Sequence, residues 1–144
     1  MPISDTARRQ LIALQTADEG APIWVKTVPL VLDSRANTRG RSIAYAEKAK
    51  THRTTGRLVA KAARLMSPVV FALKGPLVVR IVRQAPRLLD DDNAVSSAKS
   101  LRDGIADGLG VDDRDSRVTY VVDQEKSKTT GVLVEFYRVR GGGS

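Results

Sequence analysis

The sequence predicts an α+β fold: a mixed sheet of about four strands, two principal helices and a short N-terminal helix. The chain has 144 residues, the length of one ordinary domain, and 42% of them are hydrophobic, enough to bury a core. Four Val- and Ile-rich segments have the composition of strands, and two longer segments repeat their apolar residues at helical spacing.

In the first half of the chain, residues 1–20 predict a short helical extension to the main domain, which we place at 21–140. Residues 23–32 predict a strand, in which Pro29 indicates a sheet edge or a bulge. A polar loop, 34–42, leads to a predicted helix at 45–66 that Pro68 ends. The apolar face expected for this helix consists of Leu58, Val59, Ala62, Leu65 and Met66.

In the second half, residues 77–83 predict a strand that Pro86 stops. An acidic run follows, and residues 94–109 then predict a helix, weakened in its second half by Gly104 and Gly108. Residues 116–123 and 131–139 predict two closing strands. The last four residues, 141–144, are expected to be a flexible linker or tail.

Composition excludes several chemistries. The chain has no cysteine and one histidine, His52, which rules out disulfides, thiolate zinc sites, cysteine nucleophiles and paired-histidine catalysis. No apolar run approaches the roughly 20 residues that span a bilayer, and the N-terminus lacks a signal-peptide pattern. We therefore expect no membrane partner and a cytoplasmic location, in a bacterial or phage-infected cell.

Charge is unevenly distributed. The 24 Lys and Arg residues exceed the 16 Asp and Glu residues, giving a net charge of +8, which favours a polyanionic partner such as DNA. Residues 1–68 carry a net +7, whereas residues 85–125 carry −5. The expected phosphate contacts are in the loop and the basic helix: Arg35, Arg39, Arg41, Lys48, Lys50, Arg53 and Arg57. The alternative is that these side chains only form a solvated surface.

Two acidic clusters stand out within the −5 block. Asp90, Asp91 and Asp92 are consecutive, and Asp112 and Asp113 follow about 20 positions later. Clustered carboxylates are ligands for Mg²⁺, and a Mg²⁺-dependent phosphodiesterase needs neither His nor Cys. The alternative is that Asp92 or Asn93 only caps the following helix and the other carboxylates are solvated.

The order of these residues resembles that of a known family. Asp90, Asp92 and Asn93, then Lys99 and Asp103, then the Asp112-Asp113 pair, are similar to the motif of the RusA family of Holliday junction resolvases. The resemblance implies a homodimeric endonuclease that cuts four-way DNA junctions with Mg²⁺. It also implies that Asp90, Asp92 and Asp113 are the catalytic and metal-binding aspartates and that Lys99 is the active-site lysine. This lysine follows Asn93 by six positions, where the best-known form of the motif has three.

Geometry limits how one chain can build such a site. An unbroken helix over 94–109 would separate the two acidic clusters by roughly 24 Å. Either the helix breaks near Gly104 or Gly108 and the chain turns back, or a symmetric partner supplies one cluster. Two other function classes also remain open: a non-catalytic DNA-binding protein, and a structural protein that is basic without a nucleic-acid role.

Overall fold

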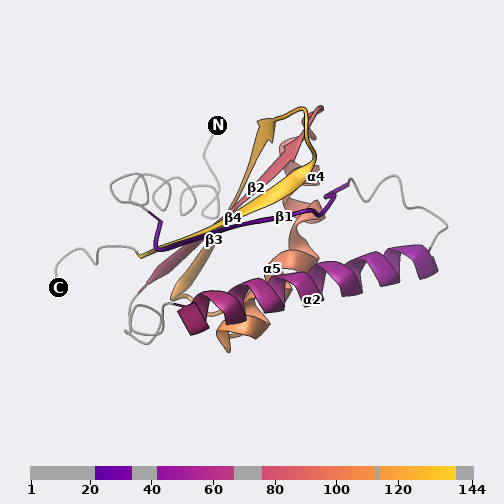
Figure 1. The fold of residues 1–144 in the computed structure, drawn as a ribbon. Helices are drawn as coiled ribbons and strands as arrows, with labels where there is room; N and C mark the ends of the chain where they lie inside the picture. Colours follow the sequence, from indigo (N-terminus) through magenta and orange to yellow (C-terminus); the bar gives the residue numbers. More distant parts are fainter. Residues whose placement is uncertain (1–21, 34–41, 67–75, 113, 139–144) are drawn as a thin grey trace, which may run out of the picture.

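A computed structural model describes residues 22–33, 42–66, 76–112 and 114–138, and within these ranges it confirms the predicted α+β class. The described part contains four strands and three helices (Figure 1). In chain order they are β1 (Trp24–Val28), α2 (Ser42–Met66), β2 (Leu77–Ala85), α4 (Asp91–Ser97), α5 (Lys99–Leu109), β3 (Val118–Lys126) and β4 (Gly131–Arg138). The predicted N-terminal helix, the loop arginines and the C-terminal tail lie outside the described residues.

The strands form one mixed sheet in the order β1-β4-β2-β3. Strands β2 and β3 are parallel and are joined through α4 and α5, whereas β4 runs antiparallel to both β2 and β1. Strand β1 lies at an edge, as the edge interpretation of Pro29 predicts. The strand ends at Val28, directly before this proline, so the prediction that it extends through Pro29 to residue 32 is wrong. Strand β2 likewise ends directly before Pro86.

The helices α2 and α5 lie on the same side of the sheet (Figure 1) and share a core with it. Val79 on β2 is paired in register with Tyr120 on β3 and Phe136 on β4, so these side chains point to one face of the sheet. Leu101 and Ile105 of α5 pack against that face, and both are fully buried.

The buried face of α2 differs from the predicted one. Three of the five residues predicted to be buried are exposed: Leu58 is 59%, Leu65 80% and Met66 69% exposed. Of the other two, Val59 is buried and Ala62 is half-buried. The face that packs on the core is built from small residues and the single histidine: His52, Gly56, Val59, Ala60 and Ala63. The reason is close contact with α5, because a Cβ atom on Gly56, Gly104 or Gly108 would collide with the opposite helix. Backbone proximity, and not the largest apolar side chains, selects the buried face.

The helix predicted over 94–109 is two helices, and the expected break at Gly104 or Gly108 is wrong. The break is at Ala98, where the Ser97 hydroxyl donates to the carbonyl oxygen of Ala94 at 2.7 Å. That carbonyl would otherwise accept from the Ala98 amide, which donates instead to Val95 at 3.2 Å. Gly104 and Gly108 lie inside α5 and provide its contact with α2.

Candidate functional site

The first acidic cluster forms the N-terminus of α4, just after the end of β2. Asp90 occupies the N-cap position, and Asp91 and Asp92 lie in the first turn, so the prediction that Asp92 or Asn93 is the N-cap is wrong. The Asp90 side chain makes no capping hydrogen bond. All three carboxylates are exposed, and none forms an ion pair with another described residue. A capping hydrogen bond therefore does not account for Asp90, whereas the helix dipole favours Asp91 and Asp92 in the first turn.

Asp112, the described residue of the second acidic cluster, lies just beyond the far end of α5. Asp103, Asp107 and Asp112 line a pocket of about 290 Å³ together with Arg53. One carboxylate oxygen of Asp103 is buried there without a hydrogen-bond partner, and Asp112 accepts a hydrogen bond from the Arg114 amide at 2.9 Å. Asp113, the predicted third ligand, lies outside the described residues.

Two aspartates near Asp112, Asp107 and Asp115, differ from those of the first cluster because each forms an ion pair with an arginine. Arg53 donates to Asp107 at 2.8 Å, and this hydrogen bond lowers the pKa of the Asp107 carboxyl. Arg117 donates to Asp115 at 2.7 Å and lowers the pKa of that carboxyl to about 2. These two aspartates have local structural partners, which Asp90, Asp91 and Asp92 lack.

Two acidic side chains of the sheet, Asp123 and Glu135, also form ion pairs. On the face opposite the helices, Arg80 donates to Glu135 at 2.8 Å and to Asp123 at 2.7 Å. The Tyr137 hydroxyl donates to the second oxygen of Glu135 at 2.9 Å. Burial raises the pKa of Asp123, but its hydrogen bonds, led by that from Arg80, leave the pKa below the ordinary value. These strand carboxylates are therefore engaged within the sheet.

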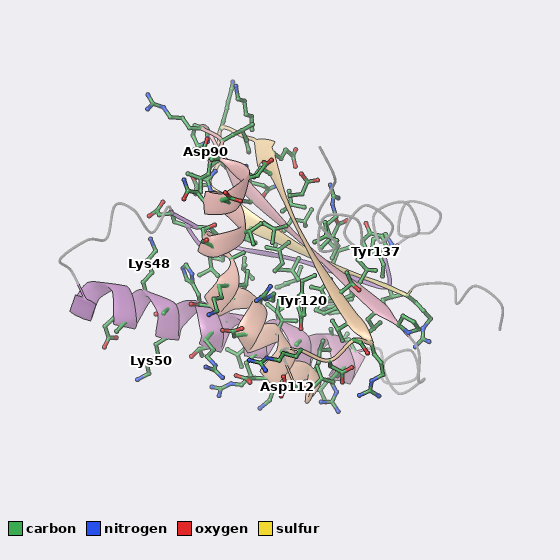
Figure 2. The ribbon with its side chains drawn as sticks, turned by 180° about the vertical axis from the view of Figure 1, so that it is seen from behind. Lys48, Lys50, Asp90, Asp112, Tyr120 and Tyr137 are labelled. Carbon is green, nitrogen blue, oxygen red and sulfur yellow. The ribbon has the colours of Figure 1, made fainter. Side chains whose placement is uncertain are left out.

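Among the described residues, the first cluster and Asp112 do not meet within one chain. Helix α5 alone has 11 residues, about 16 Å of helix, and Figure 2 shows Asp90 and Asp112 at opposite ends of the α4–α5 segment. Among the described residues, no group of three or more His, Asp or Glu side chains could hold a metal ion. Lys99, the predicted active-site lysine, is exposed at the start of α5, beyond the break that follows α4.

The basic residues of α2 form a stripe along one side of the helix. Its members recur at intervals of three and four residues: Lys50, Arg53, Arg57, Lys61 and Arg64. All five are exposed, and Arg53 is also paired with Asp107. Lys48 lies off this stripe and binds Asp33 at 2.6 Å (Figure 2 labels Lys48 and Lys50). Of the predicted DNA contacts on α2, Lys50 and Arg57 make no ion pair with another described residue.

Sequence reasoning missed two polar residues, Arg83 and Gln124, that hydrogen-bond to the chain just before the first cluster. Arg83 on β2 is only 7% exposed, and Gln124 on β3 is half-buried beside it. Both occupy positions whose strand neighbours two residues away, Ile81 and Val122, belong to or pack against the core. The available signal was the alternation of inward and outward side chains along each strand. A polar side chain at an inward position needs hydrogen-bond partners.

No protein-family model matches the chain, and no curated protein matches it. Within the described residues, no helix is long and apolar enough to cross a membrane.

Proposed function

We propose that the protein is a Mg²⁺-dependent endonuclease that cuts four-way DNA junctions. The observation that carries this proposal is the exposed turn of Asp90, Asp91 and Asp92, which has no cation partner among the described residues although the chain is basic. Three adjacent carboxylates repel one another, and the helix dipole offsets only part of that cost. A divalent cation neutralises such a cluster and allows DNA phosphate to approach.

Carboxylate oxygens suit Mg²⁺, but the described residues of one copy do not complete a site for it. We therefore propose a two-fold homodimer in which Asp90 and Asp92 of one subunit face the partner's Asp113. The bound metal would activate water and stabilise the leaving oxygen. Two such sites per dimer would match the two symmetric cuts that resolve a junction.

The basic stripe of α2 supports a DNA partner. Lysine and arginine at intervals of three and four residues present one line of positive charge, which suits a phosphate backbone and not base recognition. In the proposed enzyme the stripe holds the DNA backbone, together with Arg35, Arg39 and Arg41.

A second candidate is a non-catalytic DNA-binding protein in the cytoplasm. The separation of the two acidic clusters along α4 and α5 favours it, because a monomer with separated clusters would bind DNA without cutting it.

Incubation with a synthetic four-way junction and a linear duplex of the same sequence tests the proposal. We expect paired nicks in the junction with Mg²⁺, little cutting of the duplex, and no cutting in EDTA. Salt-sensitive binding without cleavage at any Mg²⁺ concentration would support the second candidate. Efficient cutting in EDTA would exclude the metal-dependent mechanism.

Replacing both Lys50 and Arg57 by Ala should weaken junction binding equally for arms of different sequence. If each side chain neutralises one phosphate, the slope of log Kd against log salt should fall by up to about two units. Fluorescence anisotropy at several salt concentrations measures this slope. Lys128→Ala, an exposed lysine in the β3–β4 loop, is the control and should leave the slope unchanged. An unchanged slope in the double variant would show that the stripe does not contact DNA.

A further inference from the structure

A buried arginine and a glutamine bind the chain just before the two segments to which the proposed function assigns DNA contact and metal binding. Arg83, near the end of β2, donates from Nε to the Leu32 carbonyl at 2.7 Å and from Nη1 to the Arg87 carbonyl at 2.7 Å. It also donates to Oε1 of Gln124 at 3.3 Å. These acceptors are neutral, and Arg83 has no ion pair with another described residue.

Gln124 fixes the residue that directly precedes the acidic run. Its Oε1 accepts from the Leu89 amide at 2.8 Å, and its Nε2 donates to the Leu89 carbonyl at 2.8 Å. The chain reaches Asp90 one residue later, and the Asp90 carbonyl accepts the first bond of α4, from Ala94, at 2.8 Å. The Gln124 side chain thus holds the backbone on which the exposed aspartates begin.

The same assembly also holds the chain that follows β1. Leu32 is 1% exposed and lies two residues before the predicted arginine loop at 34–42. Arg83 and Gln124 are register partners on the parallel strands β2 and β3, so their common strand end forms a rigid base. The Arg83 guanidinium therefore connects this rigid base to Leu32, before the loop, and to Arg87, before the aspartates.

A buried cation with only neutral acceptors is costly, and an apolar side chain in this core position would avoid the cost. We propose that Arg83 and Gln124 are positioning residues that fix the aspartate turn of α4, and with it the proposed metal-binding carboxylates, relative to the end of β2 and the chain at Leu32. This inference rests on the proposed function. It predicts that loss of the hydrogen bonds lowers turnover more than DNA affinity.

Gln124→Met tests the proposal because it keeps a side chain of similar length but removes both bonds to Leu89. Gln84→Met is the matched control, since Gln84 lies on the neighbouring strand β2 and is not a hydrogen-bond partner of Arg83, Gln124 or Leu89 in this assembly. We expect turnover at saturating junction to fall at least tenfold in Gln124→Met, and the Mg²⁺ concentration for half-maximal cleavage to rise several-fold. Junction affinity measured in Ca²⁺ should stay within twofold of wild type. The control should change none of these values.

Hydrogen exchange gives a readout that does not depend on cleavage. If Gln124 positions the whole turn, its substitution should accelerate exchange at the Ala94 amide as well as at the Leu89 amide. Faster exchange at Leu89 alone, with wild-type turnover, would overturn the proposal. If the wild-type protein does not cut junctions, the proposed function fails, while exchange at Ala94 and calorimetric Mn²⁺ affinity still decide the positioning role.

Arg83→Met provides a second variant. It should lower turnover like Gln124→Met and also weaken junction binding several-fold, because it releases Leu32 before the arginine loop. A folded Arg83→Met protein with wild-type turnover and affinity would contradict the proposal. If this variant does not fold, Gln124→Met alone decides.

Discussion

Asp92→Asn should lower junction cleavage at least about 1,000-fold, equivalent to roughly 4 kcal/mol of transition-state stabilisation. The substitution removes one carboxylate from the proposed metal site at nearly constant volume. It also removes a negative charge from the turn that is proposed to face DNA, so junction affinity should be unchanged or higher. Single-turnover cleavage and anisotropy on the same junction measure the two quantities.

The matched control for this prediction is Asp91→Asn, which makes the same charge change in the same helical turn but at a residue outside the proposed ligand set. It should retain activity within about fivefold, a difference of about 1 kcal/mol. Neither variant should unfold the protein, because the side chains of this turn make no structural ion pair with another described residue. Near wild-type turnover in Asp92→Asn would remove this residue from the proposed site.

Gly104→Ala should destabilise the fold by about 3 kcal/mol, although Gly to Ala in a helix interior ordinarily stabilises by about 1 kcal/mol. The added methyl group would collide with the carbonyl oxygen of Arg53 on α2, and a backbone atom cannot move aside as a side chain does. Urea denaturation measures the difference in the free energy of unfolding.

Gly110→Ala is the control for that prediction. Gly110 ends α5 with φ of 74°, where a side chain is strained, but its nearest neighbour is 3.5 Å from the added atom. We expect a loss of only about 1 kcal/mol there. Equal losses at the two positions would show that α2 and α5 are not in close backbone contact.

The sequence was sufficient to predict that four strands form and where the acidic run lies, although the first strand is shorter than predicted. Pro29 and Pro86 mark the ends of β1 and β2 because proline cannot donate a strand hydrogen bond, and this rule is local. The face of α2 could not be predicted in the same way. Its orientation depends on Gly104 and Gly108, some 50 residues away, which draw the small residues of α2 inward.

The break between α4 and α5 shows a second limit of sequence reasoning. Alanine favours helix, so nothing at Ala98 itself signals a break. At the break the Ser97 hydroxyl donates to the Ala94 carbonyl, and the Ala98 amide donates to Val95. The glycines that seemed the natural breaking points are helix contacts instead. The continuation of α5 through Gly104 matters for the site, because it keeps Asp112 at the opposite end of the α4–α5 segment from Asp90.

The claim that a site is shared between two subunits is tested most directly by mixing two inactive variants. Asp92→Asn and Asp113→Asn homodimers should both be inactive. In a mixed dimer, one shared site carries both substitutions and the other carries neither. Co-refolding the variants in equal amounts should therefore restore nicking to about a quarter of the wild-type level, since half the dimers are mixed and each has one intact site. A mixture no more active than either variant alone would contradict the shared site.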